Sequence, residues 1–193
     1  QLEGADFVAG IYGSTGGWSG VNEVYSRPPV STEQVLHPEK FLSNEQPVIP
    51  ELPELAGVLG RGWEVISENT MGEFLIRTYV EEHIERGAAS IAADGWSGDR
   101  FALLNGPEAQ RVFALLVRWD TPEDAEEFFE TYEAFGDLAT GVEAIASGGD
   151  SPSLLWVGDK QAVMLDNSGA DTLLVIGDSR PLVEMTAAAI GGF

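Results

Sequence analysis

The sequence of 193 residues contains no cysteine. It therefore has no disulfide, no thiolate nucleophile and no cysteine ligand for zinc or for an iron–sulfur cluster. Histidine is almost as scarce, because His37 and His83 are the only two imidazoles. Any serine–histidine–aspartate triad or histidine-rich metal site must use one or both of them.

The sequence also has few basic residues and no long apolar run. Ten lysines and arginines stand against 32 acidic residues, which gives a formal net charge of -22. Phosphate groups and anionic membrane surfaces are bound by clusters of lysine and arginine, so we expect no nucleic-acid partner. No apolar run reaches the roughly 20 residues that a membrane-spanning helix needs, and we expect no transmembrane segment.

The acidic excess predicts an adaptation to high salt. So many like charges repel one another in a compact fold, unless salt at about 1 M shortens the Debye length to about 3 Å and screens them. Only two lysines are present, Lys40 and Lys160, and the other cations are arginines. We interpret this composition as that of a halophilic protein, specifically a haloarchaeal one.

The hydrophobic pattern predicts that residues 1–95 are mostly helical. Residues 4–25 have helical spacing interrupted by a glycine pair, which is typical of a helical hairpin. Ser31, with Gln34 three residues later, predicts the start of a second, brief helix. Residues 43–60 contain three prolines and are predicted to form an extended connector.

Two further elements are expected before residue 95. Residues 62–66 alternate like a short strand, and Asn69 or Thr70 is placed to cap a longer helix that runs toward Ile91. The boundary near residue 95 is soft, and the two halves can also form one domain.

From residue 96 onward the pattern predicts strands. The expected order is ββαβββα. It consists of a hairpin of two strands, a helix capped by Thr121, three more strands and a helix after Ser179. Short loops favour antiparallel pairing. The expected fold class is α+β, with an N-terminal helical segment followed, over 96–193, by an antiparallel sheet that helices cover on one face. The expected strands are 101–104, 111–119, 154–157, 162–165 and 172–176.

His37 is the stronger candidate for a functional residue. It lies at a helix end before Pro38, where an imidazole can bond a free carbonyl or project into a cleft. A structural capping role and a role in a site both stay open. His83 lies in the run EEHIE, which predicts a solvated helix face.

The segment Pro28–Phe41 reads PPVSTEQVLHPEKF. It resembles the PPxSTEQ and HPEKY stretch of a family of bacterial and haloarchaeal proteins, secreted or lipid-anchored, that are similar to gluzincin-type metallopeptidases. Residues 70–74 (TMGEF) and 95–100 (GWSGDR) are similar to that family too. The resemblance covers about the first 120 residues.

The family carries a zinc-binding HExxH helix upstream of this stretch, and this sequence has none. Without two histidines at i, i+4 spacing and a glutamate between them, the chain cannot build that zinc site. We therefore expect no cofactor and no metal site in this chain, with zinc possible in an upstream part. The resemblance implies the non-catalytic C-terminal portion of a secreted or cell-surface metallopeptidase-like protein. The start at Gln1 agrees with a processed or truncated product.

In this interpretation His37 donates a hydrogen bond to a developing oxyanion, and Glu33 or Gln34 positions it. The partner is then an upstream segment of the same polypeptide. The alternative is a stand-alone binding or structural module of a halophilic cell surface, with no enzymatic activity and with a separate protein as its partner. We expect an extracellular or cell-surface location, with a halophilic cytoplasm as the alternative.

The salt dependence of stability tests the halophilic interpretation. We expect the melting temperature to rise between about 0.1 M and 3 M KCl, because screening removes the repulsion among the carboxylates. Circular dichroism during thermal unfolding measures it. A melting temperature that stays the same across this range would contradict the interpretation.

Overall fold

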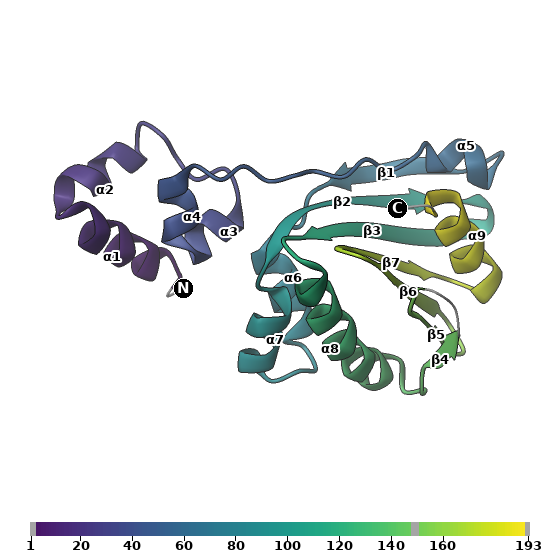
Figure 1. The fold of residues 1–193 in the computed structure, drawn as a ribbon. Coiled ribbons are helices and arrows are strands. Elements are labelled where there is room, and N and C mark those ends of the chain that lie inside the picture. The colour runs from purple at the N-terminus through teal and green to yellow at the C-terminus, as the bar shows by residue number, and fades with distance from the viewer. Residues whose placement is uncertain (1–2, 148–150, 192–193) are drawn as a thin grey trace.

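The computed structural model describes residues 3–147 and 151–191. Four short helices form a helical lobe at the N-terminal end of the described chain, and they precede a large sheet flanked by further helices (Figure 1). The helices of this helical lobe are α1 (Glu3–Thr15), α2 (Trp18–Val24), α3 (Thr32–Leu36) and α4 (Pro38–Ser43).

The remaining elements form a second unit, which we call the sheet lobe. Its strands have the order β1-β2-β3-β7-β6-β5-β4, and every neighbouring pair is antiparallel. The α+β class is therefore confirmed. Its elements are α5 (Leu55–Leu59), β1 (Glu64–Asn69), α6 (Glu73–Val80), α7 (Arg86–Ala93), β2 (Trp96–Asn105), a 3₁₀ turn (Pro107–Ala109), β3 (Arg111–Trp119), α8 (Pro122–Thr140), β4 (Ile145–Ser147), β5 (Ser153–Val157), β6 (Ala162–Ser168), β7 (Asp171–Gly177) and α9 (Arg180–Ile190).

Helices cover both faces of the sheet, whereas the sequence predicted cover on one face. Helices α6, α7 and α8 pack on one face, and α5 and α9 pack on the other (Figure 1). Strand β3 shows why, because Leu115 and Val117 face the first group while Ala114 and Leu116 face the second. A strand buried on both faces is apolar throughout and does not alternate.

The region before β2 differs from the expected single helix. Asn69 ends β1, and Gly72, with φ of 77°, is the N-cap of α6 in place of Asn69 or Thr70. The helix ends at Val80, and a new one begins after Glu85, whose carboxylate accepts hydrogen bonds from the backbone of the first turn of α7. The local cap at Glu85 restarts the helix and divides the predicted run in two.

The expected boundary near residue 95 falls between α7 and β2. Strand β1 lies before this point and pairs with β2 after it, with Asn69 opposite Phe101. The connector expected over residues 43–60 is shorter in the structure, because Leu55–Leu59 form α5. Residues 45–54 have no regular secondary structure and run from the helical lobe to α5. Val48 in this connector donates a backbone hydrogen bond of 2.8 Å to Ser97.

Asp99 of β2 fixes the start of α6. Its side chain is 0% exposed, and its carboxylate accepts hydrogen bonds from the backbone N–H of Met71 at 2.8 Å, from that of Gly72 at 2.7 Å and from the indole of Trp96 at 2.9 Å. Burial raises the pKa of Asp99, and these three donors oppose the rise because they bind the ionised form. The hydrogen bonds of Asp99 to Met71 and Gly72 hold Glu73, which follows Gly72, at a fixed place beside β2.

Replacing Asp99 by alanine should strongly destabilise the fold. Three donors, two of them buried and that of Met71 partly buried, would lose their acceptor at about 1–3 kcal/mol each, so we expect a loss of about 3 kcal/mol or more. Chemical denaturation in high salt measures the change. Asp159→Ala, at an exposed turn, is the charge-matched control and should stay within about 0.5 kcal/mol of the wild type. Equal effects of the two substitutions would contradict the role of Asp99.

Candidate functional site

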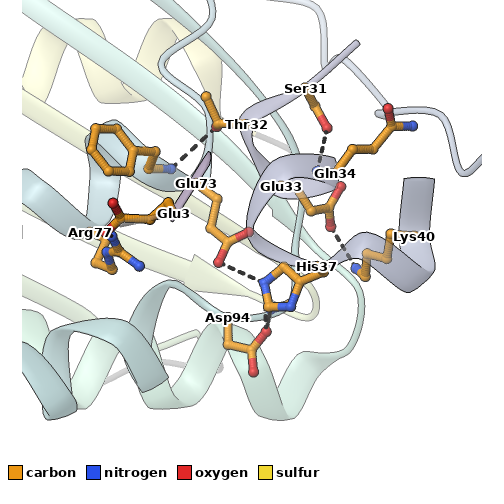
Figure 2. A network of polar contacts seen from close by, with 12 residues as sticks. Glu3, Ser31, Thr32, Glu33, Gln34, His37, Lys40, Glu73, Arg77 and Asp94 are labelled. Atoms are coloured by element: carbon orange, nitrogen blue, oxygen red, sulfur yellow. Dashed lines mark hydrogen bonds and ion pairs between the residues drawn. The ribbon is translucent and has the colours of Figure 1, made fainter. Parts of the chain in front are cut away.

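A polar cleft of about 220 Å³ lies between the two lobes. Residues of α1, α3 and the α3–α4 junction form its helical-lobe wall, and residues of α6, α7 and the turn after α7 form its sheet-lobe wall. We call this the interlobe cleft. Its lining is mostly charged, and one contact in it joins His37 of the helical lobe to the buried Glu73 of the sheet lobe (Figure 2).

The three segments that carry the family resemblance meet at this junction. Thr32 at the start of α3 accepts a hydrogen bond from the backbone N–H of Phe74 at 3.3 Å (Figure 2). Its hydroxyl lies so close to Gly72 that a Cβ atom there would be 2.6 Å from it. Gly72 also has a positive φ, so both space and backbone conformation favour glycine at this position. The motif around α3 thus packs directly against the start of α6.

His37 presents both ring nitrogens to carboxylates. Its Nε2 lies 2.9 Å from Oε1 of Glu73 and 3.4 Å from Oδ1 of Asp94 (Figure 2). Its Nδ1 lies 3.7 Å from Oε1 of Glu39. Its backbone caps the end of α3 by donating to the carbonyl of Glu33 at 2.7 Å, but the side chain makes no capping hydrogen bond to α4. The imidazole therefore projects toward the cleft.

Burial and the ion pair shift the pKa values of this contact. The hydrogen bond to Glu73 raises the pKa of His37, while partial burial opposes the rise. Burial raises the pKa of Glu73, which is only 3% exposed, while the bond to His37 opposes that rise. Within the described residues, Oε2 of Glu73 is buried and has no hydrogen-bond partner. Such an atom is costly unless something else satisfies it.

The two residues expected to position His37 have other partners. Glu33 accepts a hydrogen bond of 2.5 Å from Lys40. Gln34 donates to the carbonyl of Glu45 at 2.5 Å, and its side-chain oxygen accepts from the backbone four residues before it. In the part of the chain that the structure describes, neither is hydrogen-bonded to the imidazole of His37. Both residues instead hold the shape of the α3–α4 segment.

Glu73 and Asp94 are the site residues that sequence reasoning missed. Glu73 lies in the first turn of α6, where an acid is favoured by the helix dipole. Asp94 lies at the C-cap of α7 before Gly95, in a sequence typical of a turn. The usable signal was the TMGEF segment, where an acid stands within an apolar run next to a glycine. Only the tertiary fold brings these carboxylates to His37.

Lys40 holds a second cluster of carboxylates nearby. Its ammonium lies 2.5 Å from Glu33, 2.6 Å from Asp120 and 3.1 Å from Glu45, so it joins the helical lobe to the loop before α8. Although burial opposes it, hydrogen bonds to Asp120 and Glu33 raise the pKa of Lys40. Burial raises the pKa of Glu33 to about 7, and Lys40 opposes that rise. The ammonium already supplies the cation that these three carboxylates require.

Two arginines form a further link between the lobes. Arg77 of α6 and Arg86 of α7 both donate to Oε1 of Glu3 in α1, at 2.8 and 2.9 Å. Glu81 lies 3.4 Å from Arg77 and 3.7 Å from Arg86, so each guanidinium faces two carboxylates. Glu3 and Glu81 therefore offset the positive charges of Arg77 and Arg86 within this part of the cleft.

Replacing Lys40 by methionine should weaken the junction. The substitution keeps the apolar stem but leaves the Glu33 carboxylate, which is 2% exposed, without its cation. Breaking a buried pair in this way costs about 3 kcal/mol. Lys160→Met removes the only other lysine, which is exposed, and should change the free energy of unfolding by less than about 0.5 kcal/mol. Denaturant titrations of both variants in high salt measure this, and equal stabilities would refute the importance of Lys40.

Comparisons with known proteins yielded one family and a distantly similar structure. A solved structure, the extracellular domain of PknH from Mycobacterium tuberculosis, aligns with 76% of this chain and 96% of its own, at 10% identity and a TM-score of 0.48. None of the curated proteins matches the sequence. Within residues 3–147 and 151–191, no helix has the length and apolarity needed to cross a membrane. The model of the family described as Domain of unknown function (DUF8575) matches residues 62–186, which is more than half of the sequence, and the chain belongs to that family.

Proposed function

We propose that this chain is a non-catalytic binding module of a halophilic cell-surface protein, and that the interlobe cleft is its ligand-binding site. The observation that carries the proposal is the buried contact of His37 with Glu73 inside a cleft that both lobes build. Clefts at domain junctions with a few convergent polar groups are typical ligand sites. The charged lining makes a small charged solute the best-fitting class of ligand.

The residues of the cleft are held in place before any ligand binds. Asp99 fixes the backbone just before Glu73 through two hydrogen bonds. The backbone of His37 is held by its bond to Glu33 and by Pro38, which begins α4. Because these supports lie on helices and a strand, ligand binding would require little ordering of the chain.

Two features favour binding over catalysis. The oxyanion role predicted for His37 needs surroundings that favour a negative charge, whereas its Nε2 faces the carboxylates of Glu73 and Asp94, which would repel an oxyanion. The sequence also contains no HExxH segment. That the chain is the C-terminal portion of a metallopeptidase-like protein remains a prediction from the resemblance. The meeting of the three motif segments at the lobe junction gives their residues a structural role.

The surface of α8 supports the halophilic part of the proposal. This helix carries seven acids and no base, and most of them are exposed on its outer side. Like charges three or four residues apart destabilise a helix by about 0.2–0.5 kcal/mol per pair at low salt. High salt screens these contacts, so such a helix is best suited to concentrated electrolyte. The acids are Glu123, Asp124, Glu126, Glu127, Glu130, Glu133 and Asp137.

A thermal-shift panel tests the binding function on the full chain in about 1 M KCl, where the Debye length is about 3 Å. The panel contains amino acids, short carboxylates, polyamines and divalent cations. We expect one class to raise the melting temperature of the wild type, because a ligand at 100 times its Kd contributes about 2.7 kcal/mol. Ser90→Trp, which places a bulky ring in the cleft, should abolish that shift.

Ser67→Trp is the matched control, because Ser67 is exposed on the edge strand β1 and is not among the residues that line the cleft. It should respond like the wild type. The proposal fails if no class shifts the wild type, or if the shift persists unchanged in Ser90→Trp.

A further inference from the structure

We propose that the ligand of the interlobe cleft is a divalent transition-metal ion, bound by Nε2 of His37 and the carboxylates of Glu73 and Asp94. This inference rests on the proposed function, because it names the ligand class of the same cleft. The three side chains come from the α3–α4 junction, the first turn of α6 and the end of α7, and Figure 2 shows them turned toward one another.

The spacing of the three side chains is that of a coordination shell. One ligand atom from each lies within 4.8 Å of the other two. Nε2 of His37 is 2.9 Å from Oε1 of Glu73 and 3.4 Å from Oδ1 of Asp94. Tetrahedral zinc with bonds of 2.0–2.1 Å separates its ligand atoms by about 3.3 Å. An ion could therefore enter with only small movements of the side chains.

The second, independent observation is the unsatisfied oxygen of Glu73. The side chain is 3% exposed, it lines the cleft, and its Oε2 has no hydrogen-bond partner among the described residues. A buried carboxylate with one idle oxygen is unfavourable in the protein alone. Bidentate or bridging coordination of a cation would use that oxygen.

The neighbouring carboxylate cluster provides an internal contrast. Glu33, Glu45 and Asp120 converge in the same way, and the ammonium of Lys40 lies within 3.1 Å of all three. Among the described ion pairs, Glu73 and Asp94 have only the imidazole of His37 as a cationic partner. The cluster around Lys40 thus has a cation from the chain itself. The cluster of His37, Glu73 and Asp94 has room for a cation from solution.

The ligand types indicate which ions fit. One imidazole nitrogen and two carboxylates suit Zn²⁺ or Mn²⁺ better than Mg²⁺ or Ca²⁺, which prefer oxygen ligands alone. The Nδ1 side of His37 faces Glu39 at 3.7 Å, where an outer carboxylate commonly orients a metal-bound histidine. The remaining coordination positions would be filled by water from the open side of the cleft, where Asp94 is exposed.

Titration of the full chain with Zn²⁺ tests the inference, with Co²⁺ as a spectroscopic probe of the ligand geometry. Calorimetry in about 1 M KCl, where nonspecific attraction to the acidic surface is screened, should give a single saturable site. Co²⁺ should show the visible absorption of a low-coordinate site with a nitrogen ligand. Excess Mg²⁺ should not displace either ion.

Isosteric variants then assign the ligands. Glu73→Gln and Asp94→Asn should each weaken Zn²⁺ binding by more than about 100-fold, since loss of an outer-shell partner alone costs 10–100-fold. Asp94 is largely exposed, so its variant should fold even if Glu73→Gln is impaired. Glu123→Gln, an exposed acid of α8, is the charge-matched control and should bind like the wild type.

The outcomes separate this inference from the proposed function. Unchanged Zn²⁺ affinity in Asp94→Asn and Glu73→Gln, or the absence of a saturable site in the wild type, would overturn the metal site. If another solute class still gives a shift that Ser90→Trp abolishes, the binding function stands without the metal. If neither Zn²⁺ nor any other class binds the cleft, both fail together.

Discussion

The position of the cleft depends on one buried carboxylate, that of Asp99. Its hydrogen bonds to the backbone of Met71 and Gly72 determine where α6 begins relative to β2. That start places Glu73 at the helical lobe, where it contacts His37. A charged group without exposure to solvent is tolerated because both of its oxygens accept donors. The geometry of the site is thus set by a contact outside it.

The helical lobe is joined to the sheet lobe mainly by charged groups. In a chain with a net charge of -22, three of the ten basic residues, Lys40, Arg77 and Arg86, lie at this junction and each faces at least two carboxylates. Such ion pairs depend on direction, and the loss of either partner leaves the other charge uncompensated. They hold the walls of the cleft while leaving its interior polar, which a purely apolar interface would not do.

Local sequence signals predicted most of the secondary structure. The glycine pair between α1 and α2 and the caps at Ser31 and Thr121 are all present. The short loops predict an antiparallel sheet with helices on one face, whereas the uninterrupted apolar runs of β3 and β7 indicate burial on both faces. Strand β4, only three exposed residues long, carries too short a pattern to be predicted.

The candidate site could be predicted only in part. His37 was found because histidine is rare in the chain and this one precedes a proline. Its partners Glu73 and Asp94 lie 36 and 57 positions further along, as 73 - 37 and 94 - 37 give, and no local pattern links residues so far apart. Glu33 and Gln34 are close to His37 in sequence, but on the short helix α3 their side chains bind Lys40 and the carbonyl of Glu45.

X-ray absorption at the zinc edge tests the central claim most directly, because it reports the atoms bound to the ion in the full chain. The account predicts a first shell of nitrogen and oxygen at about 2.0–2.1 Å, with the outer scattering of a single imidazole that disappears in His37→Gln. His83→Gln, which removes the other imidazole, should leave the spectrum unchanged. An all-oxygen shell in the wild type, or imidazole scattering that persists without His37, would contradict the account.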